Sequence, residues 1–196
     1  MAATASPQDR EAIMRAAVRL AALHGSAAVE DILRAARVNR RIFYRHFASK
    51  DALLAALAAD AARVIEHELG AAVDGAANGA AAAQAWIESY LAQVWADRAA
   101  GAARPFLAPD PTAGAAVIDV VEAGHDRHRA LLESALRDGR ADGSLALVEP
   151  DDDAFTVHAI VLRHTALCVR GQIRDLPAAT AHVAGVLRRL GGAQPP

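Results

Sequence analysis

Apolar residues recur at helical spacing along most of the chain, and no stretch shows the strict apolar–polar alternation of a half-buried strand. In residues 9–24, for example, Ile13, Ala17 and Leu20 fall on one face of a helix. Alanine, the strongest helix former, is abundant, whereas aromatic residues make up only 4% of the chain. The sequence therefore predicts an all-α protein.

Glycine, proline and capping residues divide this helical pattern into segments. Asn39 and Ser49 are good N-cap residues, and Gly25 is a good C-cap. Residues 70–83 contain several glycines and predict a break. The expected helices cover residues 9–24, 28–36, 40–47, 50–69, 84–99, 103–108, 112–139, 150–169 and 177–190.

The charge of the chain is distributed unevenly. Residues 1–50 hold nine basic and four acidic side chains, a net charge of +5, whereas residues 51–196 carry −7. A basic module on an acidic body is typical of a protein with a polyanionic partner, although a solvated arginine-rich face gives the same count. The sequence thus suggests two domains, residues 1–50 for nucleic acid and residues 51–196 for the helical body.

Residues 28–54 contain two short helical segments joined by a three-residue turn at 37–39. This is the geometry of a helix-turn-helix, in which the second helix enters the major groove of double-stranded DNA. Phe43 and Phe47 are four residues apart and are expected to pack inward. Four side chains then face outward, namely Arg40, Arg41, Tyr44 and Arg45. Arginine matches the two acceptors of a guanine edge, but short helix pairs also occur in bundles that bind no DNA.

The segment VNRRIFYRHFASKDALL, residues 38–54, resembles the pattern of the TetR family, and the match covers residues 10–57. The resemblance implies nine helices, three of them for DNA binding, and a C-terminal body that binds a ligand and dimerises. It also implies repression of transcription that a small molecule relieves. By this resemblance the positions that face operator DNA are Asn39, Arg40, Arg41, Tyr44 and His46, and Lys50 grips a phosphate.

Three residues depart from the family pattern. Arg37 stands in the turn where glycine is usual, and a left-handed conformation there would cost roughly 1–2 kcal/mol. Ala28 replaces a threonine that caps the second helix. Glu30 places an acid near the expected phosphate surface, so these departures affect affinity and docking more than the fold.

The last two expected helices are candidates for a dimer interface. Residues 154–169 are apolar almost all round, with Arg163 as the clear charge, which indicates burial on more than one side. Residues 176–190 add the small residues Ala181 and Gly185. Together these helices, the eighth and ninth, predict a homodimer with a four-helix interface, with burial in a monomeric core as the alternative.

The body holds a few aromatic and histidine side chains that are candidates for an effector site. The candidates are Trp86, Tyr90, Trp95, Phe106, His125 and His128. Ligand pockets are mostly apolar with a few polar groups, but ordinary core packing explains each residue equally well. His125 and His128 are one helical turn apart, yet no acid or cysteine obviously shares their face, so we expect neither a metal nor a cofactor.

Several functional classes are excluded or disfavoured. A single cysteine, Cys168, rules out an internal disulfide, and charges interrupt every apolar run that could span a membrane. The N-terminus lacks the features of a signal peptide, so we expect a cytoplasmic protein. The sequence contains neither a credible catalytic nucleophile nor a glycine-rich phosphate-binding motif, so we do not expect an enzyme. The rivals to a transcriptional regulator are a helical ligand-binding or enzymatic bundle that uses the histidines, and a non-specific DNA-packaging protein.

Overall fold

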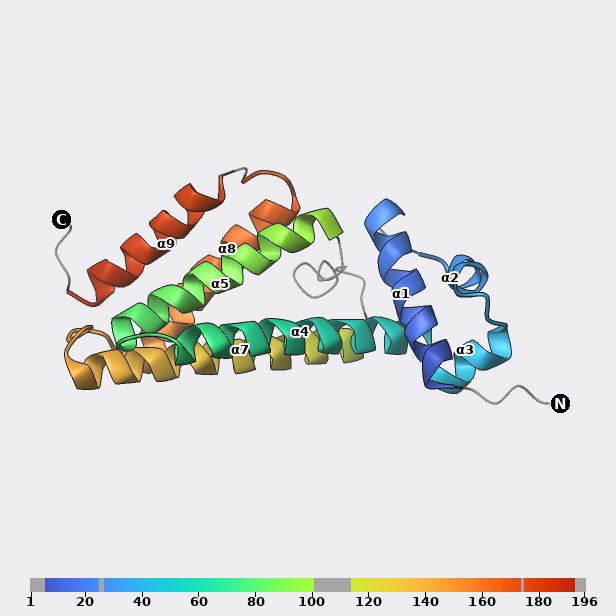
Figure 1. Cartoon of the computed structure of the whole chain (residues 1–196), viewed down its shortest axis with the longest axis horizontal. Helices are drawn as coiled ribbons and strands as arrows, with labels where there is room; N and C mark the ends of the chain where they lie inside the picture. Colours follow the sequence, from blue (N-terminus) through green and yellow to red (C-terminus); the bar gives the residue numbers. More distant parts are fainter. Residues whose placement is uncertain (1–5, 25–26, 101–113, 174, 193–196) are drawn as a thin grey trace.

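The computed structural model of the chain describes residues 6–24, 27–100, 114–173 and 175–192, and within these ranges all regular structure is helical (Figure 1). This confirms the predicted all-α class. The described helices are α1 (Pro7–His24), α2 (Val29–Ala36), α3 (Arg40–His46), α4 (Lys50–Asp74), α5 (Gly79–Ala100), α7 (Ala115–Asp142), α8 (Pro150–Val169) and α9 (Leu176–Leu190).

The first three helices enclose a small hydrophobic core at one end of the molecule (Figure 1). Ile13 of α1, Ile32 of α2 and Phe43 of α3 are buried in it. Leu53 and Leu57, from the beginning of α4, belong to the same core. The first two turns of α4 therefore pack with the N-terminal helices, and the rest of α4 continues into the body.

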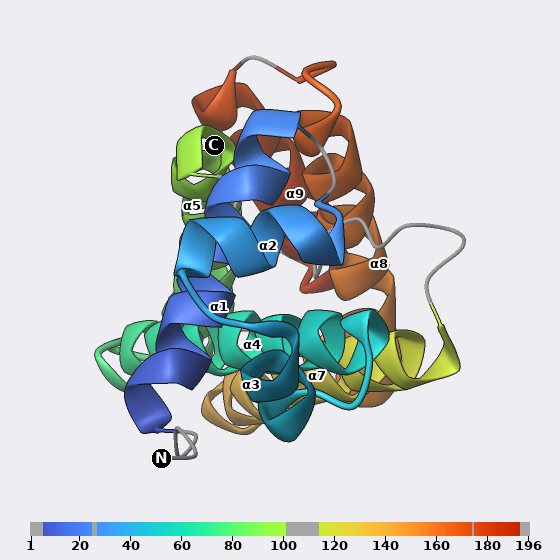
Figure 2. The same cartoon turned by 90° about the vertical axis from the view of Figure 1, so that its right-hand side faces the viewer.

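The body is built on α4 and α7, which lie side by side along the length of the molecule (Figure 1). Helix α5 packs against both, and α8 and α9 cover α5. A second, larger core runs between these helices, with Leu69, Trp86, Leu132 and Val157 fully buried. Viewed from the end of the molecule, α1, α2 and α3 lie in front of the helices of the body (Figure 2).

The break predicted at residues 70–83 is present but much shorter, because only residues 75–78 are not helical. Gly70 lies inside α4, where alanine-rich neighbours sustain the helix. Helix α5 begins early, at Gly79, because side chains satisfy its first amide groups. Asp142 accepts from the Gly79 N–H at 2.8 Å, and Ser144 accepts from the Ala80 N–H at 3.0 Å. Asn78 also caps the helix locally, by accepting from the Ala81 N–H at 2.9 Å, whereas Asp142 is the last residue of α7 and Ser144 lies in the turn after it.

The remaining helices begin and end close to their predicted positions. The long helix predicted over 112–139 is α7, and the residue that follows it, Gly143, caps it with a left-handed φ of 78°. The helix predicted over 103–108 and the cap at Gly25 lie outside the described residues. None of the described helices is both long enough and apolar enough to cross a membrane.

Candidate DNA-binding surface and the ring cluster of the body

The turn between α2 and α3 is stabilised by two backbone hydrogen bonds. Arg37 adopts a left-handed conformation, with φ 56° and ψ 38°, as expected for the position where the family pattern has glycine. Its N–H donates to the Arg34 carbonyl at 3.3 Å, and the Val38 N–H donates to the Leu33 carbonyl at 3.1 Å. This pair of bonds is a Schellman motif, which ends α2 sharply and sets the direction of the chain into α3.

Helix α3 is held in place by a cap and by two buried aromatic rings. The Asn39 side chain accepts a hydrogen bond from the Ile42 N–H at 2.9 Å, which confirms its role as N-cap. Phe43 and Phe47 are buried, and their ring centroids lie 5.9 Å apart. The Arg10 guanidinium of α1 lies over the Phe47 ring, 5.6 Å from its centroid. The orientation of α3 is therefore fixed from its buried side.

The opposite side of α3 presents the predicted DNA-facing side chains to solvent. Arg40, Arg41, Tyr44 and Arg45 are all exposed. The Tyr44 ring packs edge-on against Phe43 at 5.2 Å and remains 48% exposed, so its hydroxyl reaches outward from a fixed base. His46 is half-buried. The structure thus brings the outward-facing residues of the recognition helix onto one surface.

Lys50 is the first residue of α4 and lies half-buried at the edge of the same end of the molecule. The preceding Ser49 caps α4 by accepting a hydrogen bond from the Ala52 N–H at 3.0 Å. Asp51 supplies a negative charge to the first turn of the helix. The lysine is therefore placed by a capped helix terminus, a position from which backbone and side-chain donors can meet a phosphate together.

Helix α2 begins without a side-chain cap, because Ala28 has no hydroxyl to offer. Glu30 and Asp31 lie in its first turn and interact favourably with the positive end of the helix dipole. Asp31 also forms an ion pair with Arg34 within α2, at 2.8 Å. Glu30 instead forms an ion pair with Arg40, which lies in the first turn of α3.

Five aromatic and imidazole rings meet inside the body, and we refer to them as the ring cluster. They are Trp86 and Tyr90 of α5, His125 and His128 of α7, and His158 of α8. Tyr90 is central, with ring centroids at 5.1 Å from Trp86, 5.7 Å from His128 and 6.1 Å from His158. The His125 ring contacts the His158 ring, with 5.7 Å between the two ring centroids. The cluster therefore ties three helices of the body together.

Some polar atoms of the ring cluster are satisfied by backbone carbonyls. The Trp86 indole N–H donates to the His128 carbonyl at 3.0 Å, and the His128 Nε2–H donates to the Ala62 carbonyl of α4 at 2.9 Å. The buried Tyr90 hydroxyl and the His158 Nε2 find no hydrogen-bond partner among the described residues. The same holds for the buried hydroxyl of Thr165, two turns beyond His158 on α8. A buried polar atom without a partner costs about 1–3 kcal/mol, so these groups are candidates for binding a ligand or water.

Burial also keeps the ring cluster uncharged at neutral pH. It lowers the pKa of His125 and His128 to about 4 and the pKa of His158 to about 3, because the charged imidazolium loses its hydration. The neighbouring histidines lower the pKa of His158 further. Burial raises the pKa of the Tyr90 hydroxyl. The cluster therefore offers neutral hydrogen-bonding groups in an apolar setting.

The predicted effector-site residues are brought together in part. Trp86, Tyr90, His125 and His128 meet in the ring cluster, whereas Trp95 is half-buried against the large core farther along α5. Phe106 lies outside the described residues. His158 was missed, because it lies on a helix that is apolar almost all round and has no local feature that distinguishes it. Among the described residues, no group of three histidine, cysteine or acidic side chains is arranged to hold a metal ion.

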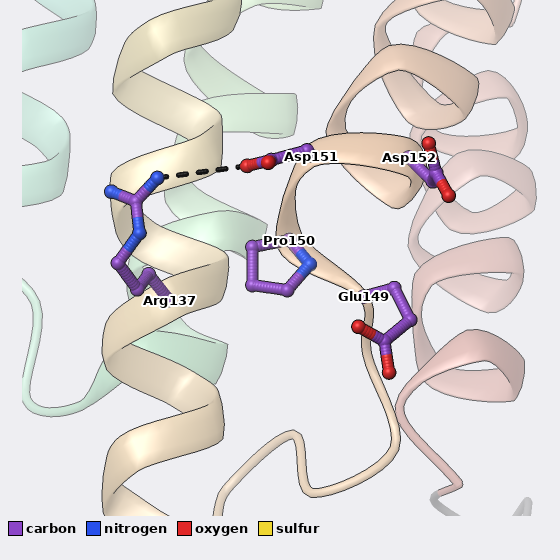
Figure 3. Close-up of a pocket in the computed structure, with 5 residues that line it drawn as sticks. All are labelled: Arg137, Glu149, Pro150, Asp151 and Asp152. Carbon is purple, nitrogen blue, oxygen red and sulfur yellow. Dashed lines mark ion pairs between the residues drawn. The ribbon is translucent and has the colours of Figure 1, made fainter.

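A separate surface cavity of about 340 Å³ lies between the end of α7 and the beginning of α8 (Figure 3). Charged side chains dominate its lining, with Arg137 in an ion pair with Asp151 at 3.6 Å. The other lining residues are Glu149, Pro150 and Asp152. Such an open, acidic site differs from the enclosed, apolar pockets that bind most organic ligands.

The chain therefore combines a capped helix-turn-helix, whose second helix is basic and exposed, with a helical body that α4 joins to it. This arrangement is typical of helix-turn-helix DNA-binding proteins. Residues 13–57 match the model of the bacterial regulatory proteins of the tetR family. The N-terminal part of the chain thus carries the sequence pattern of this family, and the match covers less than a quarter of the chain. None of the curated protein sequences compared with the chain matches it.

Solved structures of regulators share the fold over nearly the whole chain. The fatty acid degradation regulator FadR from Bacillus halodurans is 20% identical, with a TM-score of 0.78 over 96% of this chain and 97% of that one. A regulatory protein of the tetR family from Rhodococcus RHA1 is 13% identical, with a TM-score of 0.75 over 97% of this chain and 100% of that one. AibR, solved with isovaleryl coenzyme A and operator DNA, is 20% identical, with a TM-score of 0.69 over 95% of this chain and 100% of that one. At these identities the likeness establishes the fold.

Proposed function

We propose that the chain reads a specific operator in double-stranded DNA through α3. The observation that carries the proposal is the exposed pair Arg40 and Arg41 at the N-terminal end of a short helix whose opposite side is anchored by Phe43 and Phe47. Arginine at this end of a recognition helix meets base edges in the major groove. Tyr44 lies one turn farther along α3 and Lys50 begins α4, and both bind the phosphates that set the register.

The protein acts as a homodimer, with α8 and α9 of each copy forming the interface. Phe155 on α8 is 64% exposed, and Leu147, just before α8, is 70% exposed. These large exposed apolar side chains, together with the small exposed residue Ala181 on α9, favour a second copy as the partner. Two-fold symmetry then places two recognition helices on half-sites about one turn of DNA apart.

The body binds a mostly apolar small molecule at the ring cluster, and this effector releases the protein from its operator. The unpaired hydroxyls of Tyr90 and Thr165 and the His158 imidazole supply the polar contacts that such a site needs. Structures that share the fold include AibR, with isovaleryl coenzyme A and operator DNA, and a FadR from Bacillus subtilis, with stearoyl-CoA. The effector acts by favouring a conformation in which the two recognition helices no longer match successive major grooves.

Selection of bound duplexes from a randomised pool tests the DNA-binding proposal and requires no known operator sequence. We expect a palindromic motif, and Arg41→Ala is expected to remove about 1–3 kcal/mol of discrimination at one base pair of each half-site. Lys50→Ala, the comparison variant, is expected to weaken all duplexes alike and to flatten the salt dependence of binding. Recovery of random sequence by the wild type would instead identify a non-specific DNA-packaging protein.

The effector proposal is tested by screening small molecules for thermal stabilisation and titrating each hit against free and operator-bound protein. A true effector that weakens operator binding a hundredfold has a coupling free energy of about 2.7 kcal/mol, and operator DNA must weaken effector binding by the same factor. Tyr90→Phe removes only the unpaired hydroxyl and is expected to weaken effector binding. Tyr44→Phe, on α3, is expected to leave effector binding unchanged. Effector binding that is unchanged in Tyr90→Phe and His158→Phe would place the effector elsewhere in the body.

A further inference from the structure

The ion pair between Glu30 and Arg40 connects the two helices of the helix-turn-helix. Glu30 lies in the first turn of α2 and Arg40 in the first turn of α3, and the Arg40 Nη2 donates to the Glu30 carboxylate. Both side chains remain more than half exposed, with relative exposures of 59% and 62%. The pair therefore lies on the surface that α3 presents, not in the core beneath it.

The chemistry of the guanidinium leaves Arg40 able to bind two partners at once. Arginine has five N–H donors in a rigid plane, and the contact with Glu30 uses the Nη2 group. The donors that remain on the other edge suit the two acceptors of a guanine edge. A long arginine side chain loses much rotamer freedom when it binds a base, and a carboxylate that already holds the guanidinium reduces that loss.

We infer that Glu30 is a positioning residue that holds the Arg40 guanidinium for base recognition and so contributes to operator specificity. The inference rests on the proposed base-reading role of α3. Glu30 itself touches no base in this scheme. Its negative charge opposes the DNA phosphates, so its contribution is to discrimination between sequences and not to overall affinity.

The neighbouring residue Asp31 provides a matched control. It occupies the same first turn of α2, carries the same charge and is also engaged in one exposed ion pair. Its partner, however, is Arg34 within α2 and not a residue of the recognition helix. Loss of either acid weakens the start of α2 and removes one negative charge near the phosphates, and only the loss of Glu30 releases Arg40.

The test compares Glu30→Ala, Asp31→Ala, Arg40→Ala and the double variant Glu30→Ala/Arg40→Ala in the full-length protein by selection from randomised duplexes. Arg40→Ala identifies the base pair that Arg40 reads. At that base pair we expect Glu30→Ala to lower discrimination about twofold to fivefold, the range of an exposed ion pair. Asp31→Ala is expected to leave the preference unchanged. In the Arg40→Ala background, Glu30→Ala is expected to have no further effect on preference.

The possible failures can be told apart. If Arg40→Ala changes no base preference, the base-reading role of Arg40 is wrong, and with it the inference. If Arg40→Ala changes a preference and Glu30→Ala does not, the positioning role alone is overturned. Equal gains of affinity for all duplexes in Glu30→Ala and Asp31→Ala, with no change of preference in either, would show that Glu30 acts only as a negative charge. Thermal unfolding of each variant verifies that α2 and α3 remain folded.

Discussion

Arg37 adopts a left-handed backbone conformation, which is unfavourable for a residue with a side chain. An arginine at φ 56° places its Cβ close to the following carbonyl, a cost that glycine avoids. The two hydrogen bonds of the Schellman motif compensate for that strain by satisfying carbonyl groups at the end of α2. The exposed side chain of Arg37 then adds positive charge beside α3 without disturbing the turn.

Replacement of Arg37 by glycine is therefore expected to stabilise the protein. The control is Arg37→Ala, which removes the same charge but keeps the strained Cβ. We expect Arg37→Gly to exceed Arg37→Ala by about 1 kcal/mol in the free energy of unfolding, measured by chemical denaturation. Both variants lose one charge near the phosphates and are expected to bind DNA more weakly to the same extent. Equal stabilities would mean that the left-handed arginine carries no strain.

The buried histidines give the stability of the protein a specific dependence on pH. The pKa of His158 is about 3 in the folded protein and 6.5 for a free histidine, so the unfolded chain binds a proton that the folded one does not. Its contribution to stability is complete above pH 6.5 and is lost as the pH falls toward 3. His158→Phe keeps a ring in the cluster and removes this titration. Its stability relative to the wild type is expected to rise as the pH falls from 6.5 to 5, by up to about 1.4 kcal/mol per pH unit.

Chemical denaturation of wild type and His158→Phe at several pH values measures this difference directly. His67→Gln, which changes an exposed histidine of α4 outside the ring cluster, is the control and is expected to follow the wild-type pH profile much more closely. A constant difference between His158→Phe and the wild type from pH 7 to pH 5 would show that His158 is not buried in a neutral form.

At the scale of helices, the start of α5 depends on a close approach to α7. A Cβ built on Gly79 would lie 2.0 Å from the Gly139 nitrogen and 2.3 Å from the Gly139 Cα, and both atoms are backbone. Gly70, in contrast, has open space around it inside α4. We therefore expect Gly79→Ala to destabilise the protein by about 1–3 kcal/mol or more, because backbone must move. Gly70→Ala is expected to stabilise it by about 0.5–1 kcal/mol. Thermal unfolding of the two variants would contradict this packing if both shifted in the same direction.

The starts of α3, α4 and α5 show how well helix starts can be predicted from the sequence. The caps Asn39 and Ser49 lie next to the helices they begin, so α3 and α4 were predicted close to their observed starts. The start of α5 was placed five residues too late, at 84 and not at Gly79. Two of its caps, Asp142 and Ser144, lie more than sixty residues away in the chain, but the third, Asn78, directly precedes the helix. The two distant caps could not be recognised from local sequence, whereas Asn78, a good N-cap residue, could have been.

At the scale of the whole molecule, the two candidate sites differ in how far the sequence reveals them. The proposed DNA-binding surface is formed by residues of a single helix-turn-helix and the start of α4, and its outward and inward sides follow from helical spacing. The ring cluster joins α5, α7 and α8, so its membership depends on how three helices pack. Trp86 and Tyr90 stood out as rare aromatic residues, but nothing local marked His158 as their neighbour.

Assembly matters at this scale, because one copy presents only one recognition helix to DNA. Ala181 on α9 is exposed in the single chain, so a charge there costs little in the monomer and much in a packed interface. We expect Ala181→Glu to convert a dimer into a monomer of 20.4 kDa, as measured by light scattering at micromolar concentration. Ala130→Glu, at an exposed position of α7, is the control and is expected to remain a dimer.

The loss of the dimer is expected to abolish operator binding while leaving the DNA-binding surface itself intact. A monomer engages one half-site, so the second set of contacts is no longer held at high effective concentration, and affinity falls by about a hundredfold or more. Weak, non-specific binding to DNA is expected to persist in Ala181→Glu, since Arg40, Arg41 and Lys50 are unchanged. A monomeric wild type, or an Ala181→Glu variant that remains a dimer with full operator affinity, would rule out an interface through this face of α9.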